Sequence, residues 1–205
     1  MMDGRPIRIL GVAGSLREAS YNRRLVRLAA AATPDGAELI EATGLADVEP
    51  FNADLEESGF PPGVAHFARQ VLDSDAVFFA TPEYNGSVPG QLKNALDWLS
   101  RADGGPTVGS LRDSAFYGRP VAVVSASDGQ FGATWARDEL MKVLKTQGAR
   151  VLAEPKLALA AANVAFADDG TLLSADAGGR LSGLVAALVD QVRALRTARE
   201  AAGAT

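Results

Sequence analysis

The sequence predicts an α/β protein in which helices cover both faces of one parallel sheet. Two observations carry this prediction. Apolar runs of strand length alternate with amphipathic helical segments along the whole chain, which is the pattern of a doubly wound sheet. With 205 residues, of which 47% are hydrophobic, the chain is long enough to bury one sizeable core. We therefore expect a single three-layer domain over residues 1–205.

Each predicted strand is a short apolar run bounded by turn-forming residues. The first and third runs are continuous rather than alternating, as expected for strands that are buried on both faces. The second run is the weakest, and the last is interrupted by Pro155, which has no N–H to donate to a sheet. The predicted strands cover residues 7–12, 37–42, 76–81, 120–127 and 150–160.

The predicted helices are recognised by apolar residues spaced three and four apart. Ser20 is a suitable N-cap for the first helix, which Pro34 ends. The last helix keeps its spacing over four turns and gives the strongest signal. In the third helix, Trp98 lies beside the apolar stripe, which predicts an outward-facing side chain and a contact surface. The predicted helices cover residues 20–33, 61–73, 89–101, 134–147 and 177–201.

Two connections are longer than the others. Residues 43–60 contain proline, glycine and several acidic side chains, a composition typical of a solvated loop. The other interpretation of this segment is the rim of a ligand pocket. Residues 102–118 are rich in glycine, and loops longer than about 12–15 residues are uncommon unless they are functional or mobile.

Charge and composition exclude several classes of function. The formal net charge is −5, without a basic arm, so nucleic acid and acidic membrane surfaces are poor partners. The absence of cysteine excludes thiolate metal sites and a cysteine nucleophile. A single histidine, His66, cannot form a histidine metal cluster, so no metal site is expected. Neither a membrane span of ~20 apolar residues nor a signal peptide is visible, and we expect a cytoplasmic protein.

Residues 14–22, which we call the first loop, connect the first predicted strand directly to a helix. Its polar and charged candidates are Ser15, Arg17, Ser20 and Asn22. Free amide hydrogens and the positive dipole end at a helix start favour a phosphate, and hydroxyl and guanidinium groups add directional bonds. Helix capping explains Ser20 alone. The loop matches neither the P-loop nor the dinucleotide fingerprint.

The four residues Gly-Ser-Leu-Arg recur at 109–112. No predicted strand precedes this second copy, and the following serine and asparagine are missing. Aligned amides at a helix start are therefore not expected there. Arg112 in this copy provides an internal control for Arg17.

Two further loops follow predicted strands. The second loop, residues 82–90, contains two prolines, two glycines and Tyr84, which predicts a rigid turn that a planar ligand can approach closely. The third loop, residues 125–132, contains Asp128 and Gly129, a pair that is also common in ordinary turns. At carboxyl strand ends, these turns and a phosphate loop suit a flat ring with a phosphate tail.

The three loops resemble those of the NADPH-dependent FMN reductase family of flavodoxin-like proteins, which includes quinone and chromate reductases. The resemblance covers roughly residues 7–195. This chain has Gly132-Ala133 where many members have two glycines, and its connection at 102–118 is longer than in compact members. The matching motifs are Gly14-Ser15-Leu16-Arg17-x-x-Ser20-x-Asn22, Pro82-Glu83-Tyr84-Asn85-x-Ser87-Val88-Pro89-Gly90 and the run from Leu92 to Ser100.

The resemblance implies a flavodoxin-like sheet in the order 2-1-3-4-5, bound FMN, and NADPH or NADH as co-substrate. Hydride would pass to flavin N5 and then to a small oxidant (a quinone, free flavin, chromate, or an azo or nitro compound) in a ping-pong scheme. No side chain is expected to act as a catalytic acid or base. The implied cofactor-binding residues are Ser15, Arg17, Ser20, Tyr21, Asn22, Pro82, Glu83, Tyr84, Asn85, Gly86, Ser127, Asp128 and Gly129.

An FMN-binding electron carrier between proteins is the alternative function. Carriers of the flavodoxin type have no arginine at the position of Arg17 in the phosphate loop, and their surfaces are usually far more acidic. A net charge of −5 therefore favours the enzyme. The resemblance also implies homodimers or homotetramers with the flavin near the subunit boundary. An outward-facing Trp98 would contribute to that boundary, unless it packs on the long connection after its own helix.

Overall fold

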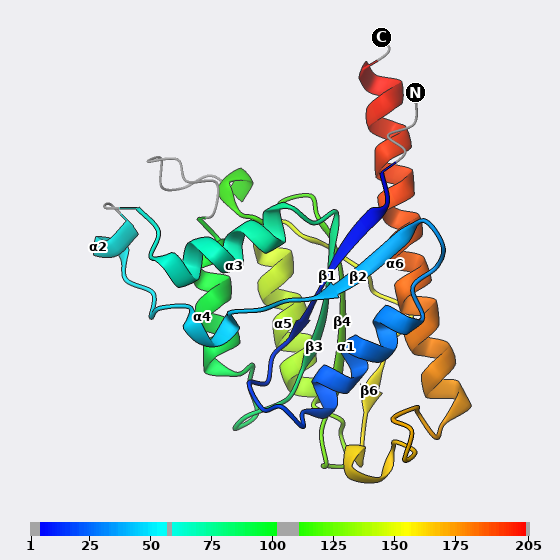
Figure 1. Cartoon of the computed structure of the whole chain (residues 1–205). Coiled ribbons are helices and arrows are strands. Elements are labelled where there is room, and N and C mark those ends of the chain that lie inside the picture. Colours follow the sequence, from blue (N-terminus) through cyan, green and yellow to red (C-terminus); the bar gives the residue numbers. More distant parts are fainter. Residues whose placement is uncertain (1–4, 57–58, 102–110, 204–205) are drawn as a thin grey trace.

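The computed structural model describes residues 5–56, 59–101 and 111–203 (Figure 1). Its sheet has the order β2-β1-β3-β4-β5, with β6 also paired to β4, and the named strands pair in parallel. The predicted doubly wound sheet and its order are therefore confirmed. The strands are β1 Ile7–Ala13, β2 Ala37–Glu41, β3 Ala76–Thr81, β4 Pro120–Ala126, β5 Arg150–Val151 and β6 Ala158–Leu159.

Helices cover both faces of this sheet (Figure 1). Helices α1 and α6 pack on one face, and α3, α4 and α5 pack on the other. The carboxyl-terminal part of α6 continues past the sheet beside the start of β1. The helices are α1 Tyr21–Ala31, α2 Ala53–Glu56, α3 Pro62–Leu72, α4 Gly90–Leu99, α5 Thr134–Thr146 and α6 Ala175–Gly203, with short 3₁₀ turns η1 Leu45–Asp47, η2 Leu111–Asp113 and η3 Ala162–Val164.

The central strand β3 shows why its apolar run is continuous. All six of its residues are buried, and alternate side chains enter opposite cores. Phe78 belongs to the core under α1 and α6, and Phe79 belongs to the core under α3, α4 and α5. Burying each phenylalanine contributes about 1.5–3 kcal/mol. In the part of the chain that is described, no helix has the length and apolar character needed to cross a membrane.

The last predicted strand is wrong in one respect, because residues 150–160 form two short strands. Arg150 pairs with Pro120 at the start of β4, and Ala158 pairs with Ser125 near its end. The chain is out of the ladder between Leu152 and Leu157, a stretch that contains Pro155, which has no N–H to donate. Within the long connection at 102–118, residues 102–110 lie outside the described residues.

Trp98 is buried, so the prediction that it faces outward is wrong. Its side chain is 0% exposed, and its ring meets those of Phe51 and Phe60 edge-on, with centroids 4.9 and 5.7 Å away. Its Nε1 donates to the carbonyl of Glu49 at 2.8 Å. Phe51 and Glu49 belong to a segment earlier in the chain, which we call the cover segment (residues 43–56).

One face of α4 holds the cover segment. Gln91, Asn94 and Trp98 are spaced three and four residues apart and therefore lie on the same side of the helix. Their side chains donate to carbonyl groups of residues 45–49 at 2.8–2.9 Å. Trp98 therefore belongs to a second stripe of side chains on α4. This stripe binds the backbone of the cover segment, so it is not available to a second subunit.

Candidate functional site

The first, second and third loops lie together at the carboxyl ends of the strands, at the lower end of the sheet in Figure 1. The hydroxyl oxygens of Ser15 and Tyr84 are 3.3 Å apart, which links the first loop to the second. The Asn22 side chain donates to the carbonyl of Ala126 and accepts from its N–H, both at 3.0 Å. These bonds link the first loop to the third. The structure thus brings together the three loops that the sequence indicated.

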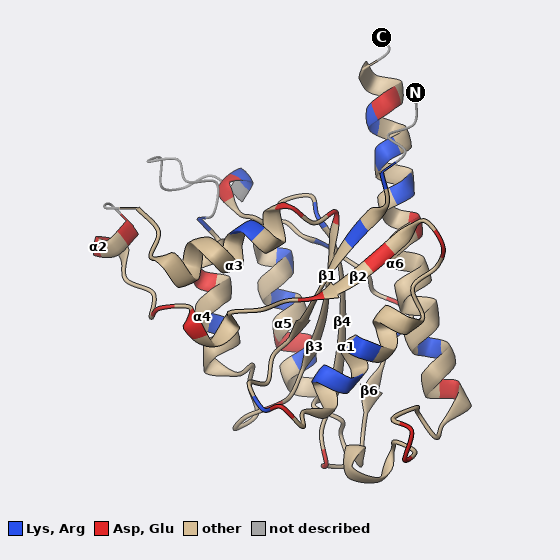
Figure 2. Cartoon of the chain, viewed as in Figure 1, with Lys and Arg blue, Asp and Glu red and all other residues tan. Residues whose placement is uncertain are grey.

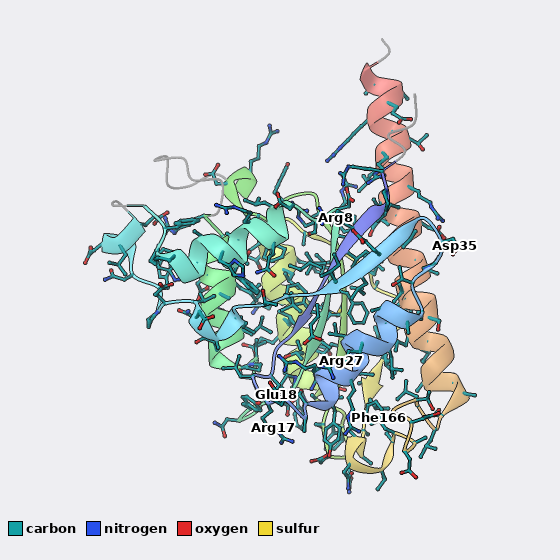
Figure 3. The ribbon with its side chains drawn as sticks, in the orientation of Figure 1. Arg8, Arg17, Glu18, Arg27, Asp35 and Phe166 are labelled. Atoms are coloured by element: carbon teal, nitrogen blue, oxygen red, sulfur yellow. The ribbon has the colours of Figure 1, made fainter. Side chains whose placement is uncertain are left out.

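The first loop offers donors at the start of α1. The Ser20 Oγ accepts the N–H groups of Asn22 and Arg23 at 3.2 and 3.4 Å, which leaves its hydroxyl proton for a ligand. The amides of Leu16 and Glu18 take no acceptor from the described residues. The Arg17 side chain is exposed and makes no hydrogen bond or ion pair with the described residues. Figure 3 shows Arg17 and Glu18 at the lower end of the sheet.

The second loop contains a two-residue hairpin turn. Tyr84 and Ser87 exchange backbone hydrogen bonds of 3.0 and 3.1 Å. Asn85 and Gly86 between them have φ of 54° and 76°, which is the type I′ geometry that Asn-Gly favours. Pro82 is buried at the start of the loop, whereas the turn itself is exposed. A rigid backbone edge therefore faces the solvent beside the first loop.

Two carboxylates fix the second loop to α5. Glu83 Oε2 accepts the N–H of Ala136 in the first turn of α5 at 3.1 Å, a favourable place for a negative charge. Glu139 Oε2 accepts the hydroxyl of Ser87 at 2.7 Å and the N–H of Val88 at 3.0 Å. The carboxylate of Glu83, a predicted cofactor-binding residue, is therefore bonded to protein. Glu139 has a positioning role that the sequence analysis missed.

The third loop is tied to β6 and to the turn after it. The backbones of Ser127 and Gly129 bond to residues 159–162, and Asp128 is exposed between them. Gly132 has φ of 58°, and an added Cβ would lie 2.7 Å from a backbone carbon of β6. Only glycine fits this position.

Ala133, which departs from the family pattern, follows Gly132 with φ of 61°. This conformation costs a non-glycine residue about 1–2 kcal/mol. The Ser125 hydroxyl donates to the carbonyl of Gly132 at 2.6 Å, which helps to hold the backbone there. The left-handed geometry of the loop is therefore retained without the second glycine.

Tyr21 lies against another aromatic ring. It stacks on Phe166 with the centroids 5.9 Å apart and the planes 10° apart, and Phe166 is labelled in Figure 3. The guanidinium of Arg24 lies over both rings. In addition to the Ser15–Tyr84 contact and the cap made by Ser20, the side chains of Tyr21, Asn22 and Glu83 therefore have partners within the protein.

Two exposed aromatic side chains next to the site were missed. Phe131 and Trp135 are 61% and 57% exposed, and their ring centroids are 5.2 Å apart. Glu83 in the second loop accepts a hydrogen bond from the N–H of Ala136, the residue that follows Trp135. The two exposed aromatic side chains therefore lie beside the second loop. The sequence signal for an exposed Trp135 was helical spacing, because Ala136, Leu140 and Leu144 form the buried face of α5 and Trp135 is not on it.

A cavity of about 430 Å³ adjoins the first loop. It lies between that loop, α1 and residues 41–47, and Ser15 and Leu45 are among its lining residues. Arg23 and Glu41 pair across part of it at 2.6 Å. Residues 43–47 of the cover segment thus form part of the rim of a cavity, whereas residues 50–55 are exposed, as expected for a solvated loop.

Residues 7–164 match the family described as NADPH-dependent FMN reductase. The chain is 37% identical over 190 residues to an NAD(P)H-dependent FMN reductase of Pseudomonas aeruginosa, covering 93% of this chain and 97% of that protein. It is 35% identical to a quinone reductase of Escherichia coli K12, covering 73% and 76%.

Among solved structures, the flavoenzyme NAD(P)H:(acceptor) oxidoreductase FerB of Paracoccus denitrificans superposes with a TM-score of 0.78. The two chains are 29% identical, and the match covers 91% of this chain and 97% of FerB. The resemblance seen in the sequence is thereby confirmed: the chain belongs to the NADPH-dependent FMN reductase family, whose members are oxidoreductases that use FMN and a reduced nicotinamide nucleotide.

Proposed function

We propose that this protein oxidises NAD(P)H and reduces a small acceptor at an FMN held among its three loops. The observation that carries the proposal is the convergence of Ser15, Tyr84 and an Arg17 side chain that has no partner among the described residues, close to the start of α1. The names of the relatives, FMN reductase and quinone reductase, support a small-molecule acceptor.

The residues at the site fit the two ends of FMN. The Ser20 hydroxyl, the Arg17 guanidinium and the free amides of Leu16 and Glu18 would hold the phosphate dianion at the helix start. The exposed backbone of residues 84–86 would support the edge of the ring, and residues 127–129 would close its other side. Proximity of both parts follows from the Ser15–Tyr84 contact.

Three of the predicted binding residues would act mainly by holding the loops in place, not by contacting FMN with their side chains. Asn22 holds the first loop to β4, Glu83 holds the second loop to α5, and Tyr21 packs on Phe166. Their side chains would keep the loop backbones at a fixed separation, which is what a rigid planar ligand requires.

Bound FMN would supply the hydride-accepting N5 atom. The protein would contribute binding, orientation and an open face on which the nicotinamide and the acceptor bind in turn. No side-chain proton transfer is required for hydride transfer. Quinones, free flavin, chromate, and azo or nitro compounds are the acceptors that we propose.

An FMN-binding electron carrier is the competing function. A carrier would bind FMN yet would not oxidise NADPH when a quinone is added. Steady-state NADPH oxidation with a quinone therefore separates the two proposals, because a yellow protein without this activity would favour the carrier.

Replacing Arg17 with alanine is expected to weaken FMN binding at least about tenfold, because a charge-assisted phosphate contact is lost. Fluorescence titration with FMN measures the effect. Arg112→Ala, in the second Gly-Ser-Leu-Arg copy, is the matched control and should leave the affinity unchanged. An unaltered affinity in Arg17→Ala would refute the phosphate role of Arg17.

The FMN-loaded protein is expected to react in two separate halves. Stopped-flow mixing with NADPH alone should bleach the oxidised-flavin absorbance, and later addition of a quinone should restore it. Steady-state lines at several quinone concentrations should be parallel. Intersecting lines would show that both substrates bind together and would contradict the ping-pong scheme.

Trp135→Ala is expected to raise the KM for a naphthoquinone about three- to tenfold, because a stacking surface beside the site is removed. The KM for ferricyanide, which has no ring to stack, should stay the same. Tyr117→Ala serves as the control, since Tyr117 is 47% exposed and follows η2. Equal changes for both acceptors would argue against stacking.

Self-association as a dimer or tetramer stays a prediction. It rests on the family resemblance, and the buried Trp98 no longer supports it. The exposed pair Phe131 and Trp135 is the aromatic surface that the structure offers instead.

A further inference from the structure

A second cavity, of about 230 Å³, lies at the amino ends of β3 and β4. It is at the opposite end of the strands from the three loops, the end at which Arg8 is labelled in Figure 3. Figure 2 shows positively charged positions along the nearby part of α6 and at the start of β1. The charged side chains that line it, among the residues that the structure describes, are Arg5, Asp75, Arg119, Arg196 and Arg199. We call it the arginine cavity.

Among the described residues that line this cavity, Asp75 carries the only carboxylate, and this carboxylate already accepts hydrogen bonds from the protein. Asp75 accepts hydrogen bonds from the guanidinium groups of Arg5 and Arg196 at 2.8–3.2 Å and from the N–H of Arg8 at 2.9 Å. Burial would raise the pKa of Asp75, but the Arg8 N–H, Arg196 and Arg5 together hold it below its usual value. Asp75 is therefore ionised, and its charge is shared by two arginines.

Arg119 is held in place by neutral groups. Its Nε donates to the carbonyl of Ala115 at 2.9 Å, and its Nη1 donates to the carbonyl of Ser74. Burial lowers the pKa of Arg119, Asp75 opposes this, and the charge of Arg199 lowers it further. Within the described residues Arg119 forms no ion pair, so its positive charge is held in place and only partly offset by Asp75.

Arg199 supplies a second such charge from the end of α6. Its side chain is exposed, and it has no ion-pair partner in the part of the chain that is described. Two guanidinium groups that face one cavity repel each other unless an anion lies between them. Guanidinium forks are well matched to phosphate oxygens.

We propose that the arginine cavity binds a phosphate group between Arg119 and Arg199. Its volume equals that of about eight water molecules, which suits phosphate, pyrophosphate or the phosphate end of a small metabolite. A complete dinucleotide is too large, so this site is distinct from the site for NADPH. Arg5 and Arg196, bonded to Asp75, add to the positive field around the ligand.

Calorimetric titration of FMN-saturated protein, in phosphate-free buffer of low ionic strength, tests this proposal. Inorganic phosphate, pyrophosphate and ADP are the probes, and their relative affinities separate a free inorganic anion from a nucleotide phosphate. We expect pyrophosphate to bind with one site per chain. Arg199→Ala should weaken this binding at least about tenfold, and Arg199→Lys should restore part of it.

Arg193→Ala is the matched control on the same helix. Arg193 bonds to Asp190 and to the carbonyl of Asp35 outside the cavity, so its removal should leave pyrophosphate affinity unchanged. Equal losses of pyrophosphate affinity in Arg199→Ala and Arg193→Ala would show that binding depends only on the general charge of the surface, and would overturn the proposal. Absence of binding by all three probes, or loss of pyrophosphate binding in Arg17→Ala, would overturn it as well.

Discussion

Replacing Asn22 with alanine is expected to lower the free energy of unfolding by about 3 kcal/mol, because two buried hydrogen bonds are lost and the backbone of Ala126 is left unpaired. The same change frees the first loop from the third. FMN affinity should therefore fall at least about tenfold, measured at a temperature where the variant is still folded.

Urea unfolding and FMN titration check the two effects separately. Gln130→Ala is the control, since Gln130 is exposed in the third loop and surface changes usually alter stability by less than about 0.5 kcal/mol. Should Asn22→Ala unfold like the wild type, the two bonds to Ala126 would contribute nothing net. A stability loss with unchanged FMN affinity would limit Asn22 to a structural role.

Gly63→Ala is expected to destabilise the protein by at least about 3 kcal/mol, because overpacking against backbone cannot be relieved by a side-chain rotation. An added Cβ would lie 1.9 Å from the carbonyl oxygen of Asp47. This close approach lets the carboxylate of Glu49 accept the N–H groups of Gly63 and Val64 at the start of α3. Separating α3 from the cover segment would break that cap.

Tryptophan emission reports where the damage occurs. Trp98 lies under the cover segment and Trp135 is already exposed, so a red shift in Gly63→Ala would come from Trp98. Gly179→Ala is the control, since an added Cβ meets nothing within 4 Å there. It should stabilise α6 by about 0.5–1 kcal/mol. A Gly63→Ala protein with wild-type stability would contradict the packing described.

The sequence predicts the sheet and the loops because both depend on local patterns. Continuous apolar runs gave β1, β3 and β4, and the helix start after the first loop gave the candidate phosphate site. The sequence does not predict which side chains form the hydrogen bonds that connect the loops to one another and to α5. Nothing near Asn22 or Glu83 in sequence reveals that their partners are Ala126 and Ala136.

The two tryptophans show the limit of helical periodicity. Both lie beside the apolar stripe of their helix, and only Trp135 is exposed. Periodicity reports the direction of a side chain relative to the sheet, but it does not report whether another segment packs over it. Trp98 is covered because polar side chains on α4 bind the carbonyl groups of residues 45–49.

The bonds between the loops also set an order of events during synthesis of the chain. The Asn22 side chain bonds to a residue 104 positions later, and the third loop needs the backbone of residues 159–162. Contacts of such long sequence separation form slowly, and domains fold only once their chain has emerged. We therefore expect a ligand that bridges the loops to bind only after β6 has formed, so that it stabilises the finished fold.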